Sequence, residues 1–254
     1  MRGSNLKVTS SREPQCQPID PGCVVVCGRR LATTQSAEYD PDSQLIERVT
    51  AMRVAIVIGS HRKDSQSAKV GRFLQKQIHA LGDHECWTCD LGKDPLPLWD
   101  EDIGTGAPHW HALDAINKNL GHTDALIVVA PEWHGMVPAA LKNFFLVCGA
   151  GGTLAHKPAL AVGVSAGPGG SYPINELRTS SYKNNRLCYL PEHLIVRNCM
   201  IVMNESDTEN DTEEHSYVSE RSAYCVRQLL AYGVALAQVR ASGAADLDAY
   251  PNGM

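Results

Sequence analysis

Short runs of continuously apolar, β-branched residues recur along this chain, and segments of helical periodicity separate them. Three of these runs are Arg53–Ile58 (RVAIVI), Ala125–Ala130 (ALIVVA) and Ala159–Ser165 (ALAVGVS). A strand this apolar is buried on both faces, which is typical of a parallel sheet covered by helices on both sides. The alternation therefore predicts an α/β fold with strands and helices in turn.

Five strands are expected in all. The second is predicted over His84–Asp90 and the fifth over Leu194–Val202. Helices are expected over Ser67–Leu81, near His111–Leu120, from Pro138 to Cys148, near Ile174–Tyr182, and from about Glu214 to Arg240. Right-handed crossovers leave two common strand orders, the flavodoxin-like 2-1-3-4-5 and half of a Rossmann fold. In both orders ligands bind at the carboxyl ends of the strands, so the loops after strands one, three and four are of interest.

The N-terminal part differs in composition from the rest. Residues 1–51 are rich in Ser, Pro, Thr and Gln and hold one aromatic residue, Tyr39. Such a segment can bury little apolar surface. We expect a disordered extension, or an added leader ahead of a native start at Met52, since the opening Met1–Ser4 is typical of such leaders. The alternative is an arm that packs on a neighbouring subunit. The α/β domain is expected over 52–241, with a flexible tail over 242–254.

Charge and cysteine content exclude several classes of protein. The net charge of −5 and the pI near 6.0 argue against nucleic acid or anionic membrane as the main partner. The longest apolar run is strand-sized, which predicts no membrane span, and the N-terminus lacks the apolar core of a signal peptide. Nine scattered cysteines in a chain of this size indicate free thiols in a reducing compartment, so a cytoplasmic location is expected.

The loop after the first strand, Gly59–Ser67 (GSHRKDSQS), carries the strongest chemical signal. Serine hydroxyls, an arginine and free backbone N–H groups are expected at a helix N-terminus, where the helix dipole favours an anion. This favours binding of a phosphate monoester. The spacing is neither a Walker loop nor GxGxxG. The alternative is a helix that Ser65 or Ser67 merely caps. The candidate phosphate ligands are Ser60, Arg62, Ser65 and Ser67.

Two later loops suit a flat ring. The loop after the third strand combines an aromatic residue with Gly and two prolines, and the loop after the fourth has three glycines in four positions, which lets backbone approach a ligand closely. Either could instead be a plain turn. Together with a phosphate site, the set favours a mononucleotide with a large planar base, and FMN is the leading candidate.

At these motifs the sequence resembles the NADPH-dependent FMN reductase family. The family's GSxRxxSxS-type, PEYNGS…PxxLKN-type and VSxGxxGG-type loops read here GSHRKDSQS, PEWHGMVPAALKN and VSAGPGG, over roughly Met52–Arg240. The resemblance implies a flavodoxin-like three-layer sandwich with strand order 2-1-3-4-5. It also implies that the first loop binds the FMN phosphate. The ribityl chain and isoalloxazine would be lined by Pro131, Glu132, Trp133, His134 and Gly135 of the second loop, and the polar edge of the ring would be contacted by Ser165, Gly167, Gly169 and Gly170 of the third. Trp133, His134 and Met136 depart from the family's Tyr, Asn and Ser.

The family resemblance implies an enzyme that passes hydride from NADPH or NADH to FMN and on to a small-molecule acceptor. A homodimer or homotetramer is expected on the same ground. No catalytic acid or base is needed, because stacked rings mainly require a near-attack geometry. Backbone N–H groups of Gly167–Gly170 are a hypothesis for stabilising the anionic reduced flavin. The alternatives are an FMN electron carrier that serves a protein partner and a non-catalytic flavodoxin-like module.

Two further motifs are interpreted as structural. Cys86 and Cys89 form a CxxC, but on a strand they point to opposite faces, so neither a redox dithiol nor a zinc site is expected. His109 and His111 have no acidic or cysteine partner positioned with them, and no metal site is predicted. His134 could protonate near a flavin or could point to solvent.

Overall fold

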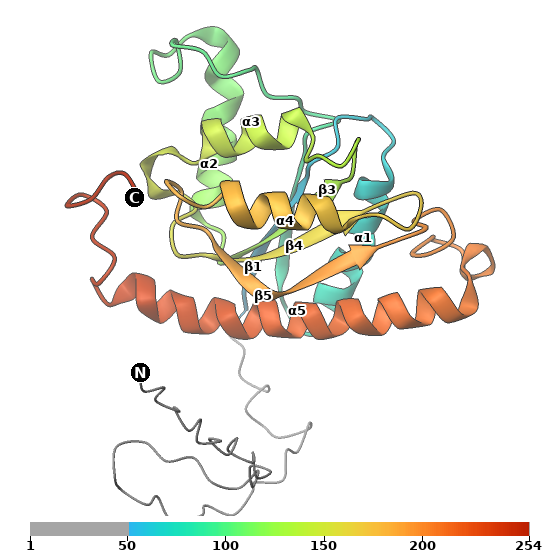
Figure 1. Ribbon diagram of the computed structural model, residues 1–254. Helices are drawn as coiled ribbons and strands as arrows, with labels where there is room; N and C mark the ends of the chain where they lie inside the picture. The colour runs from blue at the N-terminus through green and yellow to red at the C-terminus, as the bar shows by residue number, and fades with distance from the viewer. Residues whose placement is uncertain (1–50, 254) are drawn as a thin grey trace, which may run out of the picture. The chain divides into compact units, whose positions relative to one another are not determined.

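The computed structural model describes residues 51–253, and the predicted N-terminal extension lies outside them apart from Ala51. Five parallel strands form one sheet in the order β2-β1-β3-β4-β5, as the flavodoxin-like alternative predicts (Figure 1). The strands are β1 Arg53–Ile58, β2 Glu85–Asp90, β3 Ala125–Pro131, β4 Pro158–Val164 and β5 Cys188–Val196. The helices are α1 Gln66–His79, α2 His111–Gly121, α3 Ala139–Cys148, α4 Ser171–Ser180 and α5 Thr212–Ala241. Short 3-10 turns cover Pro108–Trp110, Ala150–Gly152 and Asp207–Glu209.

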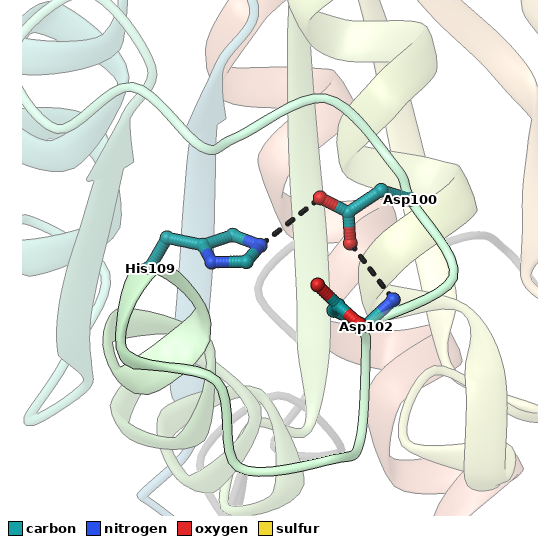
Figure 2. Close-up of side chains that lie close together, drawn as sticks. All are labelled: Asp100, Asp102 and His109. Carbon is teal, nitrogen blue, oxygen red and sulfur yellow. Dashed lines mark hydrogen bonds and ion pairs between the residues drawn. The ribbon is translucent and has the colours of Figure 1, made fainter.

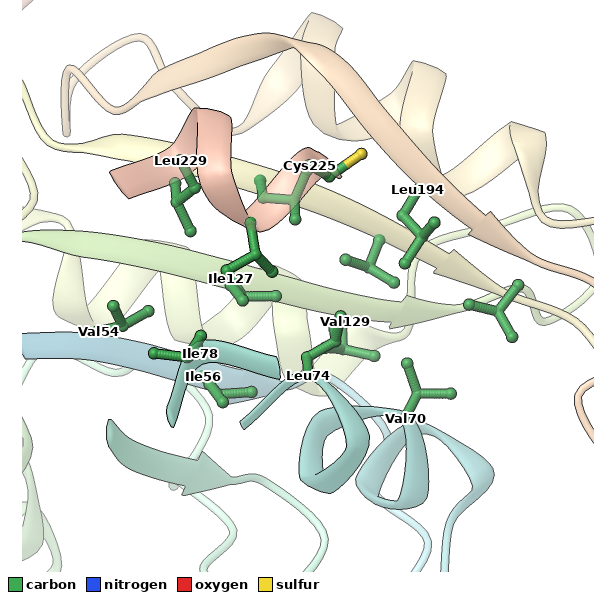
Figure 3. Packing of buried hydrophobic residues seen from close by; sticks show 14 of the residues in the cluster. Val54, Ile56, Val70, Leu74, Ile78, Ile127, Val129, Leu194, Cys225 and Leu229 are labelled. Atoms are coloured by element: carbon green, nitrogen blue, oxygen red, sulfur yellow. The ribbon is translucent and has the colours of Figure 1, made fainter. Parts of the chain in front are cut away.

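Helices cover both faces of the sheet, which makes a three-layer sandwich. On one face, alternate β1 residues such as Val54 and Ile56 pack against Leu74 and Ile78 of α1 and Leu229 of α5 (Figure 3). The other face belongs to α2, α3 and α4. There the intervening strand residues meet side chains that include Leu120, Leu141, Phe144 and Leu177. Because strands β1, β3 and β4 are buried on both faces, their uninterrupted apolar runs are explained.

Helix α1 shows how local sequence sets the elements around the ligand-binding edge. Ser65 is its N-cap and accepts a hydrogen bond from the Ala68 N–H at 3.0 Å. Val70, Leu74 and Ile78 recur at helical spacing and are fully buried against the sheet. A Cβ on Gly71 would lie 2.4 Å from Ile58 Cδ1, so glycine lets α1 approach β1 closely.

The fifth strand lies earlier than the sequence predicts. It spans Cys188–Val196 rather than Leu194–Val202, and the chain turns after it, with φ of +44° at Asn198. A bulge opposite Ala159 and Ala161 accommodates Pro191. Arg178 of α4 secures this bulge by donating from Nη2 to the carbonyls of Leu190 and Pro191 at 2.6 and 2.8 Å. Proline is tolerated because β5 is an edge strand.

Smaller boundary differences occur in two helices. Helix α4 begins at Ser171, three residues before the predicted Ile174, and Pro138 is the N-cap of α3 rather than part of its first turn.

The C-terminal tail lies along the connection between α4 and β5. Arg186 donates to the carbonyl of Pro251 at 3.4 Å, and the Gly253 N–H donates to Asn184 Oδ1 at 3.2 Å. Within residues 51–253 no helix combines the length and the apolar character needed to cross a bilayer.

Candidate functional site

The loops after β1, β3 and β4 meet at the carboxyl edge of the sheet and are fastened to one another. The His61 ring meets the Trp133 ring edge to face at 4.4 Å between centroids, and the Arg62 guanidinium carbon lies 5.4 Å from the centre of the Trp133 ring. The Gly170 N–H donates to Glu132 Oε2 at 2.5 Å. The contacts of Trp133 with His61 and Arg62 join the β1 loop to the β3 loop. The hydrogen bond to Glu132 joins the β3 loop to the β4 loop. The structure therefore brings the three predicted loops together.

The start of α1 has the properties of an anion site. Ser60 and Ser67 are both 1% exposed, and the Ser60 Oγ accepts the Arg62 N–H at 3.3 Å. Ser67 is the second residue of α1, and its buried Oγ has no hydrogen-bond partner among residues 51–253. No acidic residue lies in the first turn. Ser65 takes the Ala68 N–H, but the N–H groups of Gln66 and Ser67 have no acceptor among residues 51–253. An anion here would therefore meet donors that the described residues leave free.

Residues after β2 hold the β1 loop in place. A Cβ on Gly92 would lie 2.3 Å from the Arg62 carbonyl oxygen and 3.2 Å from that of Ser60, so only glycine allows this approach. The buried Asp90 accepts the Gly92 N–H at 3.0 Å, which orders the turn. The loop that carries the candidate phosphate ligands is therefore backed by a fixed strand end.

The β3 loop closes on itself in a tight turn. Trp133 and Met136 exchange backbone hydrogen bonds of 3.2 and 2.9 Å, and the two residues between them, His134 and Gly135, have φ of +51° and +73°. Positive φ at both central positions is the type I′ pattern. Among residues with a side chain, Asn, Asp and His adopt it most readily, so His134 preserves the backbone that Asn would give. Its side chain is exposed.

A carboxylate from α4 supports the end of this loop. Glu176 accepts the Val137 N–H at 2.7 Å and pairs with Lys142 of α3 at 2.5 Å. Burial alone would raise the pKa of Glu176, but the hydrogen bonds from Lys142 and Val137 outweigh it and hold the pKa below its usual value. The Tyr172 ring lies 3.9 Å from the position of a Cβ on Gly135. Helix α4 thus positions the β3 loop.

The β4 loop uses part of its own donor capacity. The Gly167 N–H donates to Ser165 Oγ at 3.2 Å, and the Gly170 N–H is taken by Glu132. Proline has no N–H, so Ala166 and Gly169 carry the N–H groups of this loop for which residues 51–253 supply no acceptor. Of the predicted donors in Gly167–Gly170, the Gly169 N–H is therefore the one still available to a ligand, and the Ala166 N–H lies beside this set. The side chain of Glu132, predicted to line the cofactor, is turned toward the β4 loop.

Asn143 is a residue whose role the sequence did not reveal. Its side chain is 5% exposed, donates from Nδ2 to the Pro97 carbonyl at 2.6 Å, and accepts the Trp99 N–H at 2.9 Å. It ties the proline-rich loop after β2 to α3. A buried amide in a helix requires partners, but the sequence gives no indication that they lie more than forty residues earlier.

A second group on that proline-rich loop corrects the expectation for the His109 pair. Asp100 Oδ2 lies 3.0 Å from His109 Nε2, and the Asp102 N–H donates to Oδ1 of the same carboxylate (Figure 2). The Trp110 Nε1–H also donates to Asp100 Oδ1, at 2.9 Å. His109 thus has an acidic partner after all, because the loop turns back through Gly104 and Gly106 at positive φ. The hydrogen bonds, that from Trp110 first, lower the pKa of Asp100. The group fastens an exposed loop.

The CxxC is a structural pair. Cys86 packs against the α1 and α5 side of the sheet and Cys89 against the other side, as expected for alternate faces of a strand. Burial raises the pKa of Cys86 to about 11 and that of Cys89 to about 12. Both are therefore protonated, unreactive thiols at neutral pH. All six cysteines of the described residues are free.

Comparisons with known proteins agree with this geometry. The family model described as NADPH-dependent FMN reductase matches residues 52–199. A quinone reductase of Pseudomonas putida is 32% identical over 133 residues, which is 48% of this chain and 64% of that protein. A 2-hydroxy-1,4-benzoquinone reductase of Burkholderia sp is 30% identical over 93 residues, 37% of this chain and 48% of that protein. The chain thus matches less than two thirds of the length of these curated relatives.

Solved structures share the fold at low sequence identity. FerB, a flavoenzyme NAD(P)H:(acceptor) oxidoreductase from Paracoccus denitrificans, superposes with a TM-score of 0.58 at 21% identity, over 73% of this chain and 98% of that one. An azoreductase from Bacillus anthracis gives a TM-score of 0.52 at 14% identity, over 70% of this chain and 99% of that one. These likenesses establish the flavodoxin-like architecture of the described residues.

Proposed function

The chain belongs to the NADPH-dependent FMN reductase family, and from that premise we propose that it is an oxidoreductase that binds FMN where the β1, β3 and β4 loops meet. The observation that carries the proposal is the start of α1, where the Ser67 hydroxyl is buried without a partner among residues 51–253 and the first turn holds no acidic residue. A buried hydroxyl without a partner costs about 1–3 kcal/mol. A phosphate group would remove this cost and gain the helix N-terminus as well.

The predicted residues fit the parts of FMN. Ser60, Ser65, Ser67 and the exposed Arg62 would bind the phosphate. Pro131–Gly135 would line the ribityl chain and the ring through a stiff type I′ turn, and Ser165–Gly170 would meet the polar edge of the ring with the N–H groups that the protein leaves available. When bound, FMN supplies the hydride chemistry, accepting from a nicotinamide and donating to a second substrate. The protein's contribution is to hold the ring and to leave one face of it open to stacking partners.

For the other partners, support comes from the relatives and from composition. We propose a quinone-type small molecule as acceptor, since curated relatives are named quinone reductases, and NADPH or NADH as donor. We further propose a cytoplasmic homodimer or homotetramer. Free cysteines support the reducing compartment. Exposed Met136, Leu146 and Tyr172 on and beside the β3 loop support burial against a second copy. Residues 1–51 and 242–254 are proposed to lie outside the catalytic domain.

The test is an anaerobic titration of purified protein with NADPH and with NADH, after loading with FMN. We expect bound FMN to absorb near 450 nm (about the usual value for flavins) and to bleach on addition of at least one nicotinamide. A quinone added afterwards should restore the absorbance. Bound FMN that neither nicotinamide bleaches would point to an electron carrier. The proposal would be refuted if the purified protein bound neither FMN nor riboflavin.

A further inference from the structure

Glu132 is the clearest feature of the site that the proposed function leaves unexplained. It lies in the β3 loop, within a motif that is expected to line a cofactor. Its carboxylate instead crosses to the neighbouring loop and accepts the Gly170 N–H at 2.5 Å. The other oxygen, Oε1, lies 2.9 Å from the position that a Cβ on Gly169 would take. The carboxylate therefore rests directly on the backbone that precedes α4.

Helix α4 needs such a group. Its N-cap is Gly170, with φ of +102° and no side chain to accept from the first turn, and the first turn holds no acidic residue. An anion at a helix N-terminus is stabilised by the free N–H groups and by the helix dipole. Glu132 supplies that anion from the β3 loop. It is close enough because β3 and β4 are neighbours in the sheet, with Pro131 opposite Val164.

The backbone that Glu132 holds has little freedom of its own. A Cβ on Gly163 would lie 2.1 Å from the Gly170 carbonyl oxygen, and one on Gly170 would lie 2.7 Å from Ile195 Cγ2. These contacts fix the loop from below, and the carboxylate fixes it from the side of the β3 loop. The neighbouring Gly169 is one of the two residues whose N–H remains available to a ligand.

We propose that Glu132 is a positioning residue: its carboxylate occupies the N-terminus of α4, fixes Gly169 and Gly170 for contact with the ring, and leaves the start of α1 as the seat for phosphate. A glycine-rich loop before a helix is otherwise itself a site for phosphate. Glu132 thereby gives the mononucleotide one orientation. The inference rests on the proposed function and assigns Glu132 a role in place of direct contact with the cofactor.

The first experiment compares FMN and riboflavin binding by fluorescence quenching in wild type, Glu132→Ala and Glu132→Gln. We expect Glu132→Ala to lower the affinity for both ligands by about 10-fold, since the loss of a hydrogen bond to a charged group has an effect of that order. The ratio of the two affinities should stay within about 3-fold of wild type, because the phosphate seat on α1 is intact. Glu192→Gln is the matched control, a half-buried carboxylate paired with Arg221 away from the site.

The second experiment separates charge from simple structural support. In Glu132→Gln the amide oxygen can still accept the Gly170 N–H, but the fixed negative charge beside the ring is gone. We expect the midpoint potential of bound FMN to rise in Glu132→Gln and to stay unchanged in Glu192→Gln, because a nearby negative charge disfavours reduction to an anion. Since Glu132→Gln is nearly isosteric, it keeps this test available should Glu132→Ala fail to fold.

The outcomes distinguish failure of the role proposed for Glu132 from failure of the proposed function. If wild type binds FMN but neither variant changes affinity or potential, the role of Glu132 is refuted and the proposed function stands. A fall in FMN affinity alone, with riboflavin unaffected, would place Glu132 at the phosphate and also overturn the inference. If wild type binds neither FMN nor riboflavin, the proposed function and the inference fail together.

Discussion

Two helices begin at the same edge of the sheet, and they treat the positive end of the helix dipole in opposite ways. Helix α1 has Ser65 as its N-cap and no acidic residue in its first turn, and the described part of the chain offers the buried Ser67 hydroxyl no partner. Helix α4 has a glycine N-cap and receives the carboxylate of Glu132. One N-terminus is open to an anion and the other is already filled. This contrast is what the proposed function requires, since it assigns the phosphate of FMN to the start of α1 and the ring to the loop before α4.

The comparison also explains why serine and glycine are distributed as they are. Serine hydroxyls can donate to a phosphate and accept from backbone, so they suit the open end. Glycines let backbone approach a flat ligand, and they suit the end where the charge is already supplied. The following predictions test each half of this contrast, beginning with the change of largest expected effect.

Gln66→Glu places a negative charge at the N-terminus of α1, like the one that Glu132 places at the N-terminus of α4. Gln66 is the first residue of α1, and its buried Oε1 has no partner. Two unit charges about 4 Å apart near a protein surface repel by ~4 kcal/mol. Even half of that repulsion, ~2 kcal/mol, should weaken FMN binding by about 30-fold. Riboflavin, which has no phosphate, should be affected by less than about 3-fold.

Its control is Gln75→Glu, the same change on a half-buried residue more than two turns along α1. This variant should bind FMN like wild type, because the added charge lies beyond a Debye length of about 8 Å. The measurement is the dissociation constant of each flavin by fluorescence titration. Equal losses for FMN and riboflavin in Gln66→Glu would place the ring, rather than the phosphate, at α1.

Ser67→Ala should separate stability from binding. Without ligand, the variant loses a buried hydroxyl that has no partner, so its free energy of unfolding should equal that of wild type or exceed it by up to about 1 kcal/mol. FMN affinity should nevertheless fall by about 10-fold, the loss of one hydrogen bond to a charged group. Urea denaturation and flavin titration measure the two quantities.

Ser222→Ala is the control for Ser67→Ala. Ser222 is a fully buried serine of α5 whose Oγ donates to the Ser219 carbonyl at 2.7 Å. Its replacement should leave FMN affinity unchanged. A destabilised Ser67→Ala with normal FMN affinity would mean that Ser67 is a structural residue, and the open N-terminus would lose its main support.

Ser65→Ala tests the structural side of the same helix start. Its Oγ accepts the Ala68 N–H at 3.0 Å, and loss of an N-cap of this kind costs about 1 kcal/mol. Thermal and urea unfolding should show that loss without ligand, in contrast to Ser67→Ala. Ser171→Ala, at the exposed first position of α4, should be within about 0.5 kcal/mol of wild type because no side-chain cap is lost there. A similar loss in both variants would contradict the assignment of caps.

The sequence predicted the strands and loops of this edge well because their signals are local. Fully apolar runs marked β1, β3 and β4, and serine or glycine clusters marked the loops after them. What it missed depends on partners distant in the chain. Leu194–Val202 looked like the fifth strand, because the guanidinium of Arg178 that fixes the bulge at Pro191 has no sequence signature.

The direction of Glu132 was hidden for the same reason. A glutamate in a loop can face a ligand, solvent or another loop, and only the neighbouring positions of β3 and β4 bring the Gly170 N–H within its reach. The hydrogen bonds of Asn143 to the proline-rich loop, and of Asp100 to His109, likewise form only after the chain has folded. The sequence thus predicted which loops meet at this edge, whereas the contacts that support them are visible only in the folded structure.

Glu176 extends the comparison to a third helix start and gives the smallest effect. Like Glu132 it is a borrowed carboxylate, accepting the Val137 N–H ahead of α3 and pairing with Lys142. Its pKa lies below the usual value in the folded protein, so it stabilises the fold above the unfolded-state pKa of about 4.3, and this contribution is lost as pH falls through the folded-state value. Glu176→Gln should therefore be less stable than wild type by up to about 1 kcal/mol at pH 7, given its partial exposure. The difference in urea-unfolding free energy should shrink as the pH falls below the unfolded-state pKa and disappear once the pH is below the folded-state pKa. A difference that persisted unchanged in acid would show that the carboxylate's shape, rather than its charge, holds the β3 loop against α4.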